Sequence, residues 1–493
     1  MAKTSTRLSV GFVTLFLGAM SQSKAAQLEE SACHIDGFET PVRCVRFEVP
    51  RDYDEPNGEI LTLAAVIVPA LTARPAPDPL ITLAGGPGQA ASGLGAAIES
   101  AFGRVRRTRD IVLFDIRGTG LSRALACEGS PEGILAVQVL DESGTSSSPV
   151  AQMSRFASDC AARHGAAAAG NSFYEVVQDL EQFRALNGYE RINIWGASFG
   201  TRIAQHYVRA HDERVRAVVL DAAAPPGLSA FESVPRTSQA ALDRLFADCA
   251  TDTTCARDFP RLEQTFGDLL ARADAAPEIV TLPDPRTGTP KRYVFDGDSI
   301  RGAVFGGLYI ELTRSLLPLA IVRAAKSEFG PLLAISATTG SWSSDTMALG
   351  STLSVLCAED WRQALAAAPS ERSGGFMGDL YFRTFNAACE AWPSEPVPRS
   401  MFETFASSAA ALAVSGTLDP VTPPTLAESA LAQFKTSVHL VIPGAFHTNP
   451  THRCVTRVVA EFLEDPLVGG RDHGCLGDAP RPTFVGMLAG GAP

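Results

Sequence analysis

The pentapeptide Gly196–Gly200, with the letters G-A-S-F-G, is the feature that most restricts the fold of this chain. It follows the apolar run Ile192–Trp195 and precedes a helix-like stretch, Thr201–His211. Because the two glycines lack Cβ atoms where the chain turns most sharply, Ser198 can adopt strained backbone angles and project its hydroxyl above a parallel sheet. The motif alone arises by chance in about one chain in four of this length, so its surroundings decide its meaning.

Short apolar runs alternate with helix-like stretches on both sides of this motif. Runs that are apolar throughout are typical of strands buried on both faces of a parallel sheet. The expected strands are Ile60–Val68, Leu80–Leu83, Asp110–Phe114, Ile192–Trp195, Val215–Leu220, Ala411–Val414 and Val438–Ile442. The sequence therefore predicts an α/β fold with a mostly parallel central sheet flanked by helices.

The sheet pattern is interrupted once. After Pro225 and Pro226 the sequence becomes mostly helix-like, and strand signals return only near Ala411. At 493 residues the chain is long enough for one large core that carries an insertion. We expect a first core segment at 26–226, a helical cap at 227–345 and a second core segment at 346–493.

The first 25 residues have the features of a secretory signal peptide. Lys3 and Arg7 precede the apolar stretch Leu8–Met20, and small residues at Ser23 and Ala25 fit a cleavage site. A retained anchor is the alternative, but a spanning helix needs about 20 apolar residues. We expect a secreted or periplasmic protein without stable membrane insertion after cleavage. Cleavage removes three cations and no acid, so the net charge moves from −12 to −15, which argues against nucleic acid as a partner.

All ten cysteines follow this segment, and an oxidising compartment would join them in disulfides. Their order suggests neighbouring pairs, although the sequence alone leaves other pairings open. The expected pairs are Cys33–Cys44, Cys127–Cys160, Cys249–Cys255, Cys357–Cys389 and Cys454–Cys475. No C-x-x-C and no cysteine–histidine cluster has zinc-finger spacing, so we expect no metal site.

A serine hydroxyl is a poor nucleophile at neutral pH, so Ser198 needs a general base and an orienting carboxylate. Asp419 and His447 each follow a late expected strand, and the order serine, aspartate, histidine is the one this architecture uses. Asp221 is a rival acid because it also ends a strand. We prefer Asp419, which lies in a turn-forming loop after the later strand.

The turn Gly85–Gly88, with the letters G-G-P-G, directly follows the expected strand Leu80–Leu83. Glycines let backbone N–H groups approach a substrate carbonyl, and this is what an oxyanion hole requires. The expected donors are the N–H groups of Gly86 and Phe199. A phosphate-binding G-x-x-x-x-G-K-[ST] loop is absent, and no cofactor is expected.

These residues together resemble the α/β-hydrolases of the prolyl aminopeptidase and secreted tripeptidyl aminopeptidase (TAP-like) group. The resemblance rests on the motifs at Gly85–Gly88, Asp115–Ser122, Gly196–Gly200, Val355–Trp361 and Gly416–Pro424. It implies a catalytic triad of Ser198, Asp419 and His447, and a cap that restricts access to peptides with a free amino terminus. The chain departs from the group at Ala84, where histidine is usual before G-G-P-G, and at Phe446 and Thr448, where glycines commonly flank the histidine.

The expected function is therefore a serine hydrolase, an aminopeptidase that releases short units from peptide amino termini through an acyl-enzyme. Recognition of an α-ammonium requires a carboxylate, and Glu359 and Asp360 are the candidates; a solvated helix face is the alternative for both. An esterase or lipase would use the same triad. A hydrolase-like binding protein without activity is a third reading.

Overall fold

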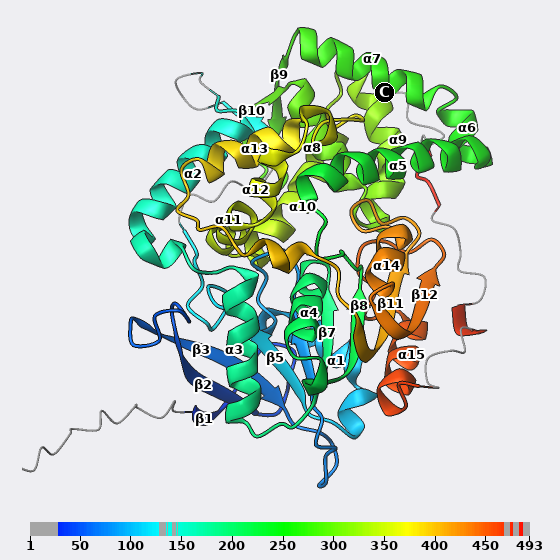
Figure 1. Ribbon diagram of the computed structural model, residues 1–493. Helices are drawn as coiled ribbons and strands as arrows, with labels where there is room; N and C mark the ends of the chain where they lie inside the picture. The colour runs from blue at the N-terminus through cyan, green and yellow to red at the C-terminus, as the bar shows by residue number, and fades with distance from the viewer. Residues whose placement is uncertain are drawn as a thin grey trace, which may run out of the picture.

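Figure 1 presents the computed structural model, in which a central sheet with helices on both faces lies beneath a layer made mostly of helices. The structure describes residues 28–127, 135, 137–140, 144, 146–467, 474–476 and 483–486. The expected signal peptide, residues 1–25, lies outside these ranges. In the described part of the chain, no helix has both the length and the apolar character needed to cross a membrane.

The central sheet contains nine strands, and its first three pairings are antiparallel while the rest are parallel. Their spatial order is β1 (Leu28–Cys33), β2 (Val42–Pro50), β3 (Ile60–Val68), β5 (Ile111–Asp115), β4 (Leu80–Leu83), β7 (Ile192–Ala197), β8 (Val215–Asp221), β11 (Ser407–Gly416) and β12 (Phe434–Ile442). The seven strands expected from the apolar runs are all present. This architecture is the α/β-hydrolase fold.

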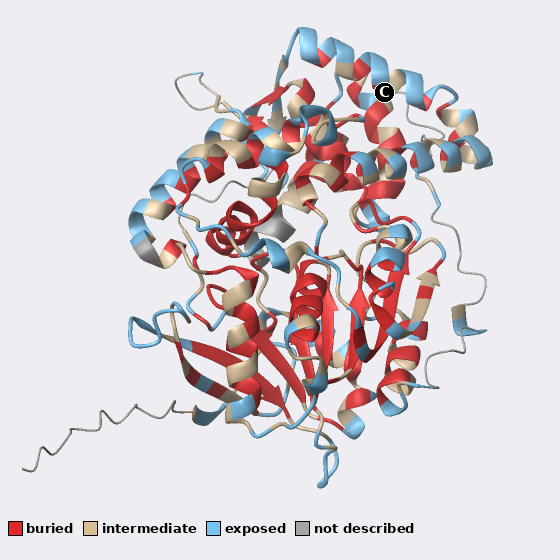
Figure 2. Cartoon of the chain, in the orientation of Figure 1, coloured by how far each residue is buried: buried red, intermediate tan, exposed pale blue. Residues whose placement is uncertain are grey.

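Helices cover both faces of the sheet. One face packs against α3 (Phe173–Leu186), α4 (Phe199–Ala210) and α14 (Pro424–Leu431), and the other packs against α1 (Gly95–Phe102) and α15 (Arg453–Glu464). The central strands are buried on both faces, as Figure 2 shows by their colour. The parallel strands therefore end at one edge of the sheet, under the cap, and their C-terminal loops meet there.

The cap begins after β8 and has its own apolar core. Its elements are α5 (Ala230–Thr251), α6 (Thr253–Asp258), α7 (Leu262–Ala275), β9 (Glu278–Pro283), β10 (Pro290–Phe295), α8 (Gly297–Gly307), α9 (Glu311–Ala324) and α10 (Gly330–Thr346). The hairpin β9–β10 pairs with the short strand β6 (Gln138–Val139) to form a small second sheet. The cap is thus mostly but not wholly helical.

Three further helices precede β11: α11 (Leu349–Ala358), α12 (Asp360–Ala366) and α13 (Leu380–Cys389). They pack with α2 (Pro149–His164) around a separate apolar cluster, whereas Leu380, the first residue of α13, belongs to the core of the cap. Helical structure therefore continues beyond residue 345. The boundaries expected at 226 and 345 stay a prediction.

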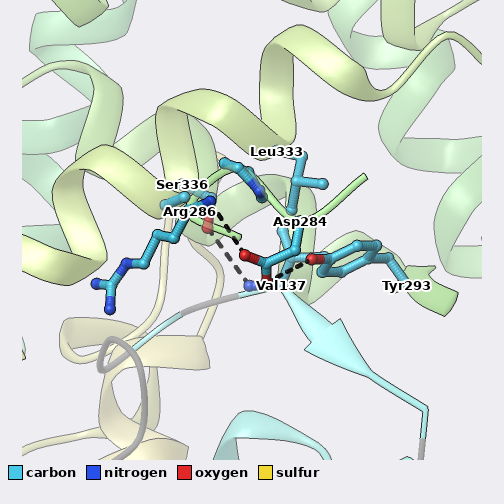
Figure 3. A pocket seen from close by; sticks show the side chains of 8 residues that line it. Val137, Asp284, Arg286, Tyr293, Leu333 and Ser336 are labelled. Atoms are coloured by element: carbon cyan, nitrogen blue, oxygen red, sulfur yellow. Dashed lines mark hydrogen bonds between the residues drawn. The ribbon is translucent and has the colours of Figure 1, made fainter. Parts of the chain in front are cut away.

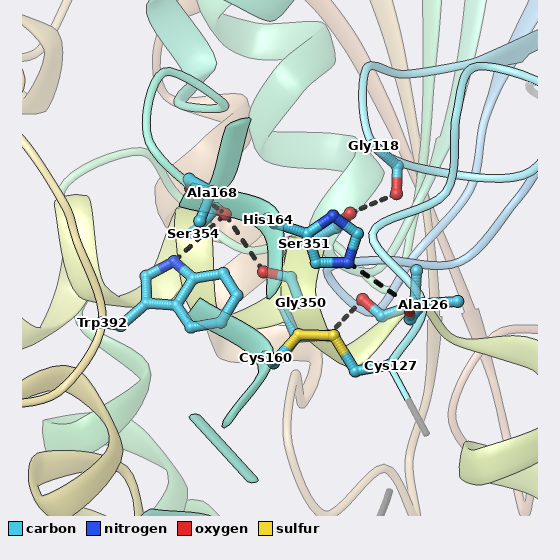
Figure 4. The surroundings of a disulfide bond; sticks show 12 residues. Gly118, Ala126, Cys127, Cys160, His164, Ala168, Gly350, Ser351, Ser354 and Trp392 are labelled. Carbon is cyan, nitrogen blue, oxygen red and sulfur yellow. Dashed lines mark hydrogen bonds between the residues drawn. A yellow bond between two sulfur atoms is a disulfide. The ribbon is translucent and has the colours of Figure 1, made fainter. Parts of the chain in front are cut away.

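The ten cysteines form five disulfides, and these join the same neighbouring pairs that their order in the sequence suggests. Cys33 and Cys44 lie on the antiparallel strands β1 and β2, whereas Cys357 and Cys389 join α11 to α13. The bond between Cys127 and Cys160 attaches α2 to the loop that follows Asp115–Ser122 (Figure 4). Each bond closes a short loop and restricts the unfolded chain.

Candidate active site

Ser198 lies at the corner between β7 and α4, as the pentapeptide predicts. Its φ of 51° and ψ of −119° fall outside the regions that most L-residues adopt, and its N–H donates a 2.8 Å hydrogen bond to the carbonyl of Asp221. A Cβ on Gly196 would clash with the backbone of Gly200, and one on Gly200 would clash with the backbone of Leu83. The two glycines are therefore required for α4 to lie as close as it does to β7 and to the neighbouring strand β4.

His447 and Asp419 complete a continuous hydrogen-bonded chain with this serine. The distance from Nε2 of His447 to Oγ of Ser198 is 2.9 Å, and the distance from Nδ1 of His447 to Oδ2 of Asp419 is 2.8 Å. Asp419 follows β11 and His447 follows β12, so adjacent parallel strands deliver both side chains to the same edge of the sheet. Residues that lie 249 and 28 positions apart in the chain thus meet in one site.

The electrostatic environment favours an ionised aspartate and a basic histidine. Burial alone would raise the pKa of Asp419, but the charge and hydrogen bond of His447 and the N–H groups of Thr422 and Val421 hold it below its usual value. Burial alone would lower the pKa of His447, but Asp419 and, more weakly, Asp221 raise it above 6.5. The imidazolium form is therefore stabilised by neighbouring carboxylates.

Sequence reasoning did not identify two side chains beside the triad. The Thr422 hydroxyl donates to Oδ2 of Asp419 at 2.7 Å and lies 3.2 Å from Nδ1 of His447. An aspartate whose side chain accepts the N–H of a threonine three residues later forms a recognisable turn. The spacing of Asp419 and Thr422 in the sequence could therefore have identified Thr422. Tyr309, from the end of the α8 segment of the cap, packs edge-on against His447 with ring centres 5.6 Å apart and an interplanar angle of 79°. No sequence pattern marks Tyr309.

The expected oxyanion turn lies next to the nucleophile. A Cβ on Gly85 would lie 3.2 Å from Cβ of Ser198, and Gly86 has a φ of +112° and a cis peptide bond to Pro87. Within the described residues, the N–H groups of Gly86 and Phe199 donate to no protein acceptor. Two backbone donors beside Ser198 are thus left for an external oxygen.

Glu359 and Asp360 do not have the environment expected of an ammonium-binding pair. Both side chains are fully buried, and Asp360 accepts hydrogen bonds from Arg202 of α4 at 2.8 and 3.0 Å and from the N–H of Ala230 at 2.9 Å. Glu359 accepts the N–H of Phe173 at 2.8 Å, and burial raises its pKa well above its usual value. Neither carboxylate is open to a substrate, and neither lies on a solvated helix face. We correct the expectation accordingly: the pair fastens the cap exit to the nucleophile helix.

The described residues contain one group of possible metal ligands, and it lies outside the triad. Cys127, Cys160 and His164 have ligand atoms within 4.8 Å of one another, but the two sulfurs are bonded to each other and are not thiolates (Figure 4). A small cavity lies inside the cap between β10 and α10, where Val137, Asp284, Tyr293, Leu333 and Ser336 line it (Figure 3). Asp284 there is paired with Lys291 at 2.7 Å, and none of the lining residues belongs to the triad.

Comparisons with known proteins agree with this site. Residues 78–275 match the family model described as the alpha/beta hydrolase fold, and residues 376–475 match the model described as TAP-like protein. Serine protease Hip1 of Mycobacterium tuberculosis is 26% identical over 462 residues, covering 85% of this chain and 84% of that protein. Tripeptidyl aminopeptidase of Streptomyces coelicolor is 26% identical over 216 residues, covering 42% and 40% of the two chains. Carboxylesterase B of Mycobacterium tuberculosis is 31% identical over 223 residues, covering 43% and 42%.

The fold and the arrangement of serine, histidine and aspartate define an enzyme of the serine hydrolase class. The two matched models together span most of the core and part of the cap. The chain thus has the α/β-hydrolase fold, and residues 376–475 form a TAP-like C-terminal region.

Proposed function

We propose that this chain is a secreted or periplasmic aminopeptidase that releases short units, from a single residue to a tripeptide, from the amino termini of peptides. The observation that supports it best is the hydrogen-bonded chain Ser198–His447–Asp419 at the sheet edge that the cap covers. The relatives named serine protease and tripeptidyl aminopeptidase favour a peptide as the substrate of this triad. The five disulfides favour an oxidising compartment.

In this proposal, Oγ of Ser198 attacks the scissile carbonyl while Nε2 of His447 takes its proton. Asp419 holds the Nδ1–H tautomer and stabilises the imidazolium. The N–H groups of Gly86 and Phe199 stabilise the oxyanion of the tetrahedral intermediate. His447 then returns the proton to the leaving amine, and a water molecule hydrolyses the acyl-enzyme by the same route.

Ser198→Ala tests this chemistry, because it removes the nucleophile without adding volume. We expect the turnover number to fall by about 10⁴-fold or more on tripeptidyl amides with a free amino terminus. Circular dichroism and thermal unfolding of the variant check that the fold is intact. Full activity in a folded Ser198→Ala protein would contradict the proposal.

A carboxylesterase is the second candidate, and the relative named Carboxylesterase B favours it. Rates on free tripeptidyl amides, on the same amides with an acylated amino terminus and on p-nitrophenyl esters separate the two. An aminopeptidase cleaves the free amide and loses activity when the terminus is acylated. An esterase cleaves the p-nitrophenyl esters, and neither amide is cleaved at a rate comparable with theirs.

A further inference from the structure

Asp221 is a buried carboxylate beside the triad that the chemistry above does not use. It ends β8, where it pairs in register with Ala197 of β7, and its side chain is fully buried. Its main-chain carbonyl accepts the N–H of Ser198 at 2.8 Å. Its carboxylate accepts the N–H of Asn449, two residues after His447, at 3.0 and 3.2 Å. One residue thus contacts both the nucleophile and the segment that carries the base.

The backbone is strained at three places around Asp221. Ser198, Ala222 and Thr448 all have positive φ values, of 51°, 61° and 56°, although none is a glycine. Such conformations crowd the Cβ atom and persist only where the surroundings hold them. Asp221 bonds to the N–H of Ser198 and immediately precedes Ala222, and its carboxylate holds the residue after Thr448.

The loop that carries His447 is held on both sides of the histidine. Before it, the N–H of Leu418 donates to the carbonyl of Ala445 at 2.9 Å, and the N–H of Gly444 donates to the hydroxyl of Thr417 at 2.9 Å. The side-chain amide of Asn449 donates to the carbonyl of Phe446 at 2.8 Å and closes the turn on itself. After the histidine, the N–H of Asn449 joins the turn to the end of β8 through the carboxylate of Asp221. Thr448 has a positive φ although it carries a branched side chain, so the contact of the next residue with Asp221 opposes a strain in the backbone.

Asp221 and His447 also interact through their charges, because Asp221 raises the pKa of His447 and His447 lowers that of Asp221. In the described part of the chain its carboxylate accepts hydrogen bonds only from Asn449, and no arginine or lysine pairs with it. Burial raises its pKa to about 7, and His447 opposes this rise. The groups that face this pair are Asp419 from the β11 loop and Tyr309 from the cap. The imidazolium form of His447 is therefore stabilised by Asp419 and, when Asp221 is ionised, by Asp221 as well.

We propose that Asp221 is a positioning residue that anchors the histidine loop to the nucleophile corner and places a second carboxylate beside His447, in addition to Asp419. The inference rests on the proposed role of His447 as the general base. Asp419 keeps the hydrogen bond to Nδ1, and Asp221 acts on the imidazolium through space and through Asn449. No proton is transferred to Asp221 in the reaction.

Asp221→Asn separates the charge from the anchoring contact, because the amide oxygen can still accept the N–H of Asn449. The test follows the rate of labelling of Ser198 by a fluorophosphonate as a function of pH. The pKa of Asp221 is itself raised to about 7, so its carboxylate stabilises the imidazolium over only part of the acid limb. Loss of this charge should still move the midpoint of the limb down, by up to about half a pH unit. Labelling at the plateau should fall by about tenfold in Asp221→Asn and further in Asp221→Ala, which also loses the acceptor.

Asp212→Asn is the matched control. Asp212 accepts hydrogen bonds from Ser407 and Ser408 at the opposite end of β8 and β11, so its loss should leave the midpoint unchanged. A midpoint that moves equally in Asp212→Asn and Asp221→Asn would assign the effect to general destabilisation and overturn the inference.

The pKa of His447, measured by NMR in Ser198→Ala protein, tests the inference without any activity. We expect a lower value when Asp221→Asn is added, and an equal value in a folded double variant overturns the inference. A His447 pKa at or below 6.5 in the Ser198→Ala protein also overturns the inference. This measurement needs no Asp221→Asn variant, so it applies even if that variant does not fold. If wild-type protein is not labelled at any pH, the proposed function fails while this titration still decides the role of Asp221.

Discussion

The hydroxyl of Thr352 donates a 2.6 Å hydrogen bond to the carbonyl of Pro87. Thr352 belongs to α11, and the N–H of Ala348 just before this helix donates to the carbonyl of Gly88 at 2.9 Å. Two hydrogen bonds from one segment thus hold the glycine turn that carries the N–H of Gly86. The geometry of the oxyanion site depends on a helix more than 260 residues later in the chain.

Thr352→Val removes this hydrogen bond and keeps the shape of the side chain. We expect kcat to fall by about tenfold with little change in KM, because a displaced oxyanion donor weakens contacts made mainly in the transition state. Steady-state kinetics on a tripeptidyl amide or ester measure both constants. Thr384→Val is the control, since within the described residues that buried hydroxyl bonds only to the carbonyl of Leu380 in its own helix, α13. Equal kcat values for the two variants would contradict the role given to Thr352.

Glu359→Gln and Asp360→Asn should differ although both side chains are fully buried. Burial raises the pKa of Glu359 well above its usual value and so disfavours its charged form, and Glu359 lies farther from Arg202, at 3.8 Å, than Asp360 does. We therefore expect the amide at this position to cost only about 1 kcal/mol. Asp360→Asn leaves the buried guanidinium of Arg202 without its closest anion, which should lower the free energy of unfolding by about 3–5 kcal/mol. Chemical denaturation at pH 7 measures both. Equal losses would show that Glu359 is ionised as well.

The pH dependence of kcat/KM follows from the shift at His447. The base must be neutral to take the proton of Ser198, and its pKa lies above 6.5 because Asp419 and Asp221 stabilise the imidazolium. Activity should therefore be lost as the pH falls through that raised value, with a half-maximum above pH 6.5. His206 cannot produce this limb, since burial lowers its pKa to about 3. A half-maximum below pH 6.5 would contradict the assignment.

Tyr309→Phe and Tyr309→Ala test the contact between the cap and the base. The Tyr309 hydroxyl makes no hydrogen bond within the described residues, so Tyr309→Phe should retain activity within about twofold. Tyr309→Ala removes the ring that packs on His447 and should lower kcat/KM by about tenfold on tripeptidyl amides. A larger loss in Tyr309→Phe than in Tyr309→Ala would assign the role to the hydroxyl instead.

The parallel sheet and the triad could be predicted from the sequence because each has a local signal. Apolar runs mark buried strands, and Ser198, Asp419 and His447 each follow such a run. The antiparallel strands β1 and β2 were not expected, since their exposed residues interrupt the apolar pattern. The buried ion pair of Arg202 and Asp360 has no local signal, because the partners lie 158 residues apart and meet only after the cap folds. Long-range contacts of this kind explain why Glu359 and Asp360 were misjudged.

The Arg202–Asp360 pair limits how this enzyme can be re-engineered. Arg202 lies one helical turn after the nucleophile, and Asp360 also holds Ala230 at the start of the first cap helix. A graft from another hydrolase that replaces the chain from α5 through α12 would remove the anion and leave its cation in the interior. Exchange of substrate range by cap transplantation therefore has to carry Asp360 along, or replace Arg202 with an apolar side chain of similar volume.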